Sequence, residues 1–421
     1  MAATDALQCI LDEIDRARDE IVDFTARMVR IPTVNPPGEY YQPCATLIGD
    51  ELRKHGADVQ LLPAVGRAEH TPQYPRVNVV GRLAGHGPAI HLNGHFDVVP
   101  TGSGWTRDPF GGELVDGKLY GRGTCDMKAG IAAAVFAAAA IRRAGVSTQA
   151  PIEISGTVDE ESGGFAGVAW LAEHGFLSRE QTRAVIIPEP FGVDRICIGH
   201  RGVYWFDVIA EGRIAHGSMP YLGVNAVEGM SHFLDLVRDE LGPALRNRIT
   251  TMPVVPEGSR AATININGID GGQPVDEVPS PCVADRCRAV FDRRFLMEEG
   301  LERTRAEIMA LLEKARQRMP EVRFSIEDRL IFEPTRTPKT APVVRALADA
   351  VRQVTGRDAA LVASPGTYDH KHVARIAGVE DCVAYGPGEL ALAHQPDEYC
   401  DVADIISATQ VLALAVVKLA S

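Results

Sequence analysis

Seven acidic and histidine residues, each in a short polar motif, are of types and spacings that can do chemistry. Histidine nitrogens combined with carboxylate oxygens form ligand sets that suit zinc, cobalt or manganese. Two of the glutamates are adjacent, so one can bind metal while the other acts as a base. The set predicts metal-assisted hydrolysis of an amide-like bond. The motifs are GHFDVVP with His95 and Asp97, GRGTCDMKAG with Asp126, TVDEESGG with Glu160 and Glu161, IIPEP with Glu189, and AHQPDEY with His394.

His95 and Asp97 lie two residues apart in an apolar segment that is typical of a strand. Residues two apart in a strand point to the same side, so Asp97 can approach the imidazole of His95 and fix its tautomer. For an isolated motif of this kind, a loop His–Asp pair without metal is the better interpretation. The motifs that follow favour the metal.

Asp126 follows a glycine-rich turn and precedes an expected helix over Lys128–Ala144. A carboxylate there can bridge two cations, and the alternative is an N-cap for that helix. Glu160 and Glu161 have side chains that diverge, so one can ligate metal while the other faces a bound water. Their alternative is a solvated acidic turn.

Glu189 and His394 complete the candidate set, and Cys125 lies beside it. Glu189 stands between two prolines after an apolar strand, which makes its position rigid. His394 lies far away in sequence, and alone it would be interpreted as a structural histidine. Cys125, next to Asp126, is interpreted as a small core residue in preference to a metal ligand or nucleophile. The whole set, in this order, is more specific than any single member.

Alternating strands and helices must position these motifs. This alternation predicts an α/β sheet, and the charged motifs follow the carboxyl ends of its strands, where open α/β sheets place their active sites. The expected strands cover residues 77–83, 89–99, 152–160 and 184–190, and the expected helices cover 128–144 and 163–175.

The pattern changes after about residue 199 and returns to α/β from about residue 338. Four strands and two helices between these points predict an inserted α+β domain over 199–331, which divides a catalytic domain into 1–198 and 332–421. The expected strands of the insert cover 203–212, 262–270, 282–295 and 322–332, and its helices cover 227–241 and 298–317.

Length and composition agree with this organisation. A chain of 421 residues is too long for one ordinary core. Its net charge of −13 argues against a nucleic-acid-binding surface. The most apolar stretch, Gly130–Ile141, is too short to span a membrane. The N-terminal residues, expected to form an amphipathic helix, lack a signal-peptide pattern. The eight cysteines form no CxxC pair, so we expect reduced thiols and a cytoplasmic protein.

Together these motifs resemble the M20 metallopeptidase family, which includes acetylornithine deacetylase and succinyl-diaminopimelate desuccinylase. The resemblance runs from RIPTVNPPGE at Arg30–Glu39 to AHQPDEY. It implies two divalent metal ions per subunit, most often zinc, with cobalt or manganese as alternatives. It also implies that Glu160 is the general base, that Asp97 orients His95, and that the peptide bond after Asp126 is cis. The implied ligands are His95, Asp126 as the bridge, Glu161, Glu189 and His394.

The inserted segment resembles the lid and dimerisation domain of that family. His216 in AHGSMP matches a histidine that stabilises the oxyanion in the active site of the partner subunit, so the resemblance implies a homodimer. Arg294 in FDRRF matches an arginine that holds a substrate carboxylate.

Several residues expected near the substrate depart from the family pattern. A TDAR-like stretch appears here as YDHK after Thr367, so Lys371 replaces an arginine, and His370 precedes it. His200 in GHRG is expected near the cleft. Asp276 stands where the family often has asparagine.

These features support a dinuclear amidohydrolase that acts on a small N-acyl amino acid or a similar carboxylate-bearing amide. One alternative is the same site adapted to another small acid, such as amide hydrolysis or deamination of an aromatic catabolic substrate. A dipeptidase or carboxypeptidase and a non-enzymatic binding protein are weaker alternatives. The partners expected are a small-molecule substrate and a second copy of the chain, with no nucleic acid and no membrane.

Overall fold

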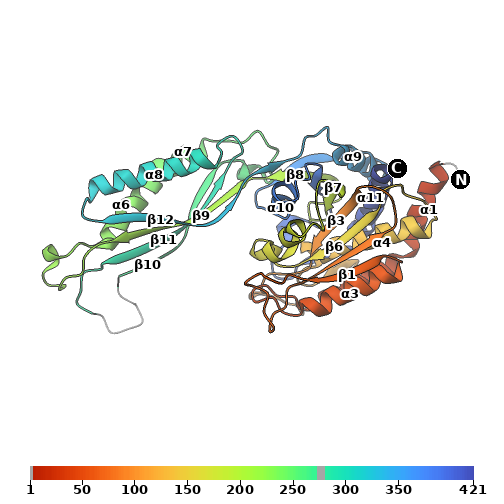
Figure 1. Cartoon of the computed structure of the whole chain (residues 1–421), viewed down its shortest axis with the longest axis horizontal. Helices are drawn as coiled ribbons and strands as arrows, with labels where there is room; N and C mark the ends of the chain where they lie inside the picture. Colours follow the sequence, from red (N-terminus) through yellow and green to blue (C-terminus); the bar gives the residue numbers. More distant parts are fainter. Residues whose placement is uncertain (1–2, 273–279) are drawn as a thin grey trace. The chain divides into compact units, whose positions relative to one another are not determined.

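The chain folds into two compact units (Figure 1). The computed structural model describes residues 3–272 and 280–421. The first unit comprises Met1–Gly199, Arg336–Val362 and Tyr368–Ser421, and the second comprises His200–Thr335 and Ala363–Thr367. The short segment 363–367 joins the second unit because Ala363 exchanges backbone hydrogen bonds with the 253–255 segment. The sequence pattern does not reveal this pairing.

A mixed sheet forms the centre of the first unit. Its strand order is β1-β2-β6-β3-β7-β15-β8-β13, and β14 pairs with β8. Strand β3 runs parallel to both β6 and β7, whereas β1, β2 and β6 pair antiparallel. The strands are β1 Asp58–Pro63, β2 Val77–Leu83, β3 Ala89–His95, β6 Ile152–Thr157, β7 Thr182–Ile187, β8 Arg195–His200, β13 Thr335–Arg336, β14 Ala360–Ser364 and β15 Cys382–Ala384.

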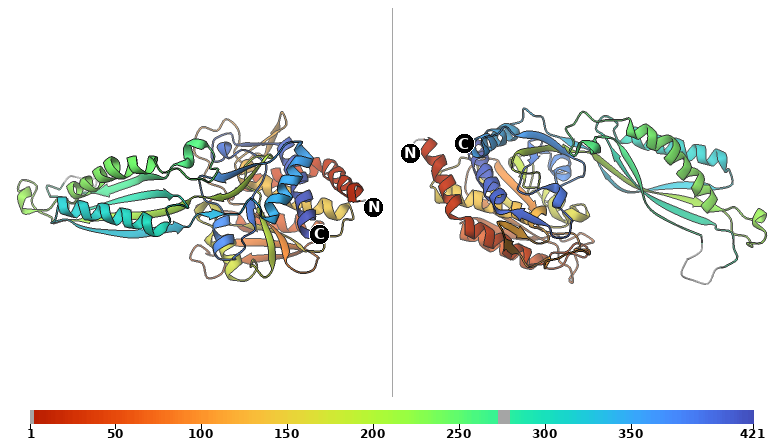
Figure 2. Two further views of the ribbon diagram at one scale, coloured as in Figure 1. Left: turned by 90° about the horizontal axis from the view of Figure 1, so that it is seen from above. Right: turned by 180° about the vertical axis from the view of Figure 1, so that it is seen from behind.

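The two faces of this sheet differ in chemistry. Gly94 of β3 lies under Ile131 of helix α4, and Gly81 of β2 lies under Leu52 of α3, so these helices cover the apolar face. On the other face, Asn78 of β2 donates to the main chain of Ala166. Figures 1 and 2 show helices on both sides of the sheet. The polar face is therefore the one that can carry chemistry.

Helices of the first unit pack around this sheet and against one another. The helical segment Thr124–Arg143, which includes α4, and helix α11 are long and apolar enough to span a membrane, but 94% and 67% of their apolar windows are buried inside the structure. They are core helices here. The helices are α1 Ala3–Arg16, α2 Arg18–Val29, α3 Tyr41–Lys54, α4 Ala129–Arg143, α5 Trp170–Glu173, α9 Pro342–Thr355, α10 His370–Arg375 and α11 Val402–Ala420.

A small antiparallel sheet brings two distant segments together. Strand β16 (Tyr399–Asp401) pairs with β5 (Lys118–Tyr120), which pairs with β4 (Glu113–Val115). Because Tyr399 lies opposite Tyr120, the loop that precedes β16 lies beside the turn that follows β5. Those two segments carry His394 and Asp126.

The second unit is a separate antiparallel sheet backed by helices (Figure 2). Its strand order is β10-β11-β9-β12, and Phe206, Phe233 and Phe291 pack at the centre of its core. The predicted α/β class with an inserted α+β domain is confirmed. The main elements are β9 Gly202–Glu211, β10 Thr263–Gly271, β11 Arg286–Phe295, β12 Arg323–Phe332, α6 Ala226–Leu236 and α8 Leu301–Arg318.

Some predicted elements are shorter than expected, for physical reasons. The expected N-terminal helix breaks into α1 and α2 at Ala17. The expected strand over 89–99 ends at His95. The expected helix over 163–175 is interrupted at Gly167, where a Cβ atom would lie 2.1 Å from the carbonyl oxygen of Val158. Close backbone approach of this kind requires glycine.

Candidate metal centre

The first group of potential ligands contains His95, Asp126 and Glu189. His95 is the last residue of β3, Asp126 follows the glycine-rich turn before α4, and Glu189 follows β7. One donor atom from each lies within 4.8 Å of the other two. Nε2 of His95 is 3.0 Å from Oδ1 of Asp126 and 3.8 Å from Oε1 of Glu189. A nitrogen and two carboxylates at this spacing suit a divalent transition metal.

A second group contains Asp126 again, with Glu161 and His394. Nε2 of His394 is 3.1 Å from Oε1 of Glu161 and 3.4 Å from Oδ2 of Asp126. The two carboxylate oxygens of Asp126 therefore face different groups, since Oδ1 lies towards His95 and Oδ2 towards His394. A carboxylate shared in this way can bridge two cations, as the sequence predicts.

The pKa shifts of these residues indicate whether the site favours positive charge. Burial raises the pKa of Glu189 well above its usual value, and burial also raises that of Glu161. Hydrogen bonds to Asp126 and Glu161 raise the pKa of His394. The pKa of His95 is raised despite its burial, mainly by a hydrogen bond to Asp126. Positive charge is therefore favoured between buried carboxylates at both histidines, and divalent cations would supply it in exchange for protons.

Asp97 anchors the segment that carries the adjacent glutamates. Its carboxylate accepts hydrogen bonds from the backbone N–H groups of Glu160 and Glu161, each 3.1 Å long, and from the side-chain amide of Asn35, 2.9 Å long. The imidazole Nδ1 of His95 lies 3.0 Å from the backbone oxygen of Asp97 and 3.4 Å from its carboxylate. Asp97 thus contacts His95 as predicted, and mainly through its main chain. Nothing in the sequence around Asn35 marks it as a partner of Asp97.

Glu160 lies beside the ligand groups and contacts Lys371. Nζ of Lys371 donates to Oε1 of Glu160 over 2.6 Å, and the lysine side chain is only 2% exposed. Burial raises the pKa of Glu160, and the positive charge of Lys371 opposes that rise. Glu160 and Glu161 therefore diverge, with Glu161 directed to His394 and Glu160 to Lys371.

A family model described as peptidase family M20/M25/M40 matches residues 91–418 of the chain. The chain belongs to this family. The resemblance stated from the motifs is therefore confirmed, and the protein is an M20 metallohydrolase of C–N bonds. Family membership implies a dinuclear metal site, and the two ligand groups that share Asp126 fit that expectation.

Relatives of this M20 chain cover nearly its whole length. Succinyl-diaminopimelate desuccinylase from Methylobacterium radiotolerans is 28% identical over 398 residues, which cover 92% of this chain and 94% of that protein. The di-peptidase Dug1p from Saccharomyces cerevisiae has a TM-score of 0.77 at 15% identity and covers 98% of both chains. A dinuclear metal binding peptidase of the M20 family from Bacillus subtilis has a TM-score of 0.68 at 14% identity, covering 96% of this chain and 99% of that one. The two solved structures share its fold.

The polar face of the M20 catalytic sheet carries a chain of hydrogen bonds that sequence analysis did not predict. Ser155 donates to Asn93 over 2.7 Å, and Asn93 donates to Asp369 over 2.8 Å. Both ring nitrogens of His91 are engaged, one 3.1 Å from Glu153 and the other 2.8 Å from Ser155. The sequence held a signal for this row, because His91, Asn93 and His95 alternate along one buried strand and so share a face.

The residues expected near the substrate in the first unit are buried. Lys371 contacts Glu160, and His370 is 1% exposed with its Nδ1 3.3 Å from the hydroxyl of Tyr368. The peptide bond between Asp126 and Met127 is cis, as the resemblance implied. Direct contacts of Lys371 and His370 with substrate remain predictions, and the observed neighbours of both residues are protein groups.

In the second unit, the expected functional residues have protein partners of their own. Arg294 forms two bonds with Asp292, over 2.7 and 3.0 Å. His216 is exposed and accepts a hydrogen bond from the backbone N–H of Ser218. His200 is buried with Nδ1 2.8 Å from the backbone oxygen of Arg201, and Thr367 is half-buried. Asp276 lies outside the described residues.

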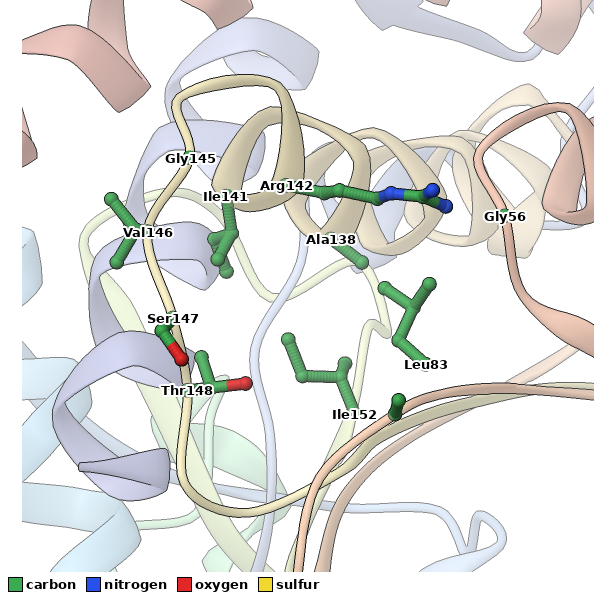
Figure 3. A pocket seen from close by; sticks show the side chains of 11 residues that line it. Gly56, Leu83, Ala138, Ile141, Arg142, Gly145, Val146, Ser147, Thr148 and Ile152 are labelled. Carbon is green, nitrogen blue, oxygen red and sulfur yellow. The ribbon is translucent and has the colours of Figure 1, made fainter.

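A hollow of about 370 Å³ elsewhere in the catalytic unit is not part of this centre. Figure 3 shows Leu83, Ile141 and Ile152 lining it beside the C-terminal end of α4. Asp126 lies just before the N-terminal end of the same helix. A helix of this length spans about 20 Å, so the hollow and the ligands lie at opposite ends of it.

Proposed function

We propose that this M20 hydrolase binds two divalent cations and cleaves the amide bond of a small N-acyl amino acid. The observation that carries the proposal is the sharing of Asp126 between two ligand groups, with Glu160 beside them. His95, Asp126 and Glu189 would hold one ion, and Asp126, Glu161 and His394 the other. We propose zinc first, with cobalt or manganese as alternatives.

The cations would lower the pKa of a bound water and polarise the carbonyl of the substrate. Glu160 would take the proton of that water, because its carboxylate is next in sequence to Glu161 yet belongs to neither ligand group and so stays free to act as a base. It would then deliver the proton to the leaving amine. Asp97 would support this step, since its carboxylate accepts the backbone N–H bonds of Glu160 and Glu161 and so fixes the turn that contains the proposed base.

An acyl amino acid is proposed because a relative that aligns over nearly the whole chain is named for removing a succinyl group. We also propose that His216 and Arg294 serve the substrate, the former by stabilising the oxyanion in the site of a partner subunit. This assignment makes the active form a homodimer. A cytoplasmic location is proposed as well, supported by the eight free cysteines of the described chain.

The test is a hydrolysis panel of N-acetyl, N-succinyl and N-formyl amino acids with protein reconstituted with zinc, cobalt or manganese. Metal-dependent release of free amine from one substrate class would support the proposal. A protein that carries two ions per subunit but releases no amine from the panel would contradict the acyl-amino-acid assignment. Aromatic amides and amines would then be tested, with ammonia release as the readout for deamination.

Glu160→Ala tests the assignment of the base. Turnover should fall by two or more orders of magnitude, about the contribution of a general base. Zinc content should stay unchanged, because Glu160 belongs to neither ligand group. Measuring both quantities on one preparation separates loss of the base from loss of metal. Near-normal turnover would show that another group removes the proton.

A further inference from the structure

The buried carboxylate of Glu398 accepts hydrogen bonds from backbone amides of the turn that carries Asp126. Oε1 of Glu398 accepts backbone N–H bonds from Gly123 and Cys125, each over 2.9 Å, and from Asp126 over 3.2 Å. Amides that converge in this way form an anion-binding concavity. Gly123 is required there, because its φ is +86° and a Cβ atom would lie 2.7 Å from Val98.

Arg122 connects this turn to the loop that carries His394. Its Nη1 donates to Oε2 of Glu398 over 2.6 Å, and the two side chains are only 2% and 0% exposed. The same guanidinium also donates to the backbone oxygens of His394 and Gln395, at 3.3 Å each, and to that of Thr101 at 3.2 Å. Arg122 therefore contacts the backbone of the His394 loop at His394 and Gln395, while Glu398 contacts the Asp126 turn.

The His394 loop has a backbone that needs such support. His394 has a φ of +64° and Asp397 a φ of +55°, in the left-handed region that residues other than glycine seldom occupy. Such conformations persist only where the surrounding structure over-determines them. The His394 side chain is 46% exposed, so side-chain burial fixes it less than it fixes the other ligands. The bonds from Arg122 constrain this loop at His394 and Gln395, whereas Thr106 and Arg107 hold it at the Asp397 carboxylate.

We propose that Arg122 and Glu398 are positioning residues that hold Asp126 and His394 together for one metal ion. This inference rests on the metal assignment made under the proposed function. It predicts an asymmetry, because within the described residues the side chains of Arg122 and Glu398 form no hydrogen bond with β3, which ends at His95, or with β7, which precedes Glu189. The ion held by His394, Glu161 and Asp126 should depend on Arg122 and Glu398 much more than the other ion does.

The experiment measures stepwise zinc affinities of the metal-free full-length protein by competition with a chromophoric chelator. Cobalt absorption spectra report the coordination of each site. In Glu398→Gln, one zinc should bind about 10–100-fold more weakly, the usual effect of losing a group that orients metal ligands. The other zinc should stay within about threefold of wild type. Unchanged affinities for both ions, or equal losses for both, would overturn the inference.

Two further variants make the result specific. His394→Ala identifies the affected ion by its cobalt spectrum, and adding Glu398→Gln to it should change the remaining affinity by less than about threefold. Residues that act as a unit are non-additive in this way. Independent losses in the double variant would overturn the assignment to the His394 site.

A matched control and a second substitution guard against unfolding. Glu299→Gln breaks the buried ion pair with Arg293 in the other unit, where the side chains are 4% and 1% exposed, and should leave both zinc affinities unchanged. Arg122→Lys keeps the charge but cannot reach three backbone oxygens, so it should weaken the same ion if Glu398→Gln fails to fold. Equal zinc affinities in Arg122→Lys and wild type would overturn the inference.

The inference and the proposed function fail in different ways. A wild-type protein that binds fewer than two zinc ions would overturn both. Two ions with no turnover of the acyl panel would overturn only the substrate assignment, since zinc affinity requires no substrate.

Discussion

Nζ of Lys371 donates to Oε1 of Glu160 at a distance of 2.6 Å, and only 2% of the lysine side chain is exposed. The lysine stands where the M20 pattern has an arginine, and the motif alone suggested a substrate contact. A compact ammonium makes one strong contact with a carboxylate, whereas a guanidinium presents a planar fork suited to a ligand. The observed contact indicates that this position supports Glu160, the proposed base.

Lys371→Met should separate these two roles. If Lys371 supports Glu160, kcat should fall about tenfold or more while KM changes less than about threefold, because the interaction is with the enzyme and not with the substrate. Lys371→Arg is the control that keeps the charge. A large rise in KM with unchanged kcat would instead assign Lys371 to the substrate, as the sequence predicts.

Subunit complementation tests the proposed role of His216. His216→Ala and Glu160→Ala should each be nearly inactive as homodimers. After mixing at equal amounts and exchanging subunits, half of the dimers are mixed and each has one intact composite site, so about a quarter of wild-type activity should return. No recovery in dimers verified to have exchanged would place His216 outside the partner's site.

Acid should destabilise the first unit through its buried histidines. Burial lowers the pKa of His370 from 6.5 to about 3. Between these values the unfolded chain binds a proton that the folded chain excludes, so stability is complete above pH 6.5 and is lost as pH falls. The loss is about 1.4 kcal/mol per pH unit for each such group. His372 has the same shift, caused mainly by burial.

His370→Gln should therefore flatten the pH dependence of stability. Urea unfolding of metal-free protein from about pH 8 to about pH 5 measures the slope, which should decrease by about one proton relative to wild type. The values at about pH 8 give the offset caused by the substitution itself. Equal slopes for the two proteins would show that His370 is protonated in the folded state.

The hydrogen-bond row on the polar face should contribute to stability. Asn93→Leu removes one hydrogen-bond partner from Ser155, which keeps its contact with His91, and one from Asp369. The lost bond of Ser155 should cost about 0.5–1.5 kcal/mol and the lost bond to the Asp369 carboxylate about 1.5–3 kcal/mol. Asn265→Ala, on the exposed side of β10, is the control and should change stability by less than about 0.5 kcal/mol. Denaturant midpoints measure both. Equal effects of the two variants would contradict a structural role for the row.

Local chemistry made the candidate ligands and the proposed base recognisable in the chain. Glycine-rich turns, adjacent glutamates and a glutamate between prolines are recognisable in sequence because each depends on a few neighbouring residues. The alternation of apolar strands and helices is sufficient to place His95, Asp126 and Glu189 at the same edge of a sheet. The inserted domain was predictable as well. Its strands alternate apolar and polar residues because one face is exposed, whereas buried strands of the first unit contain continuous apolar runs.

Tertiary structure alone decided which side chains contact one another. The pairing of Lys371 with Glu160 joins residues 211 positions apart, and the ion pair of Arg122 and Glu398 joins residues 276 apart. The division of the two oxygens of Asp126 between His95 and His394 is equally invisible in the chain. Side-chain contacts at such separations depend on strand order and on loop conformations such as that of His394, and no local pattern of residues encodes either.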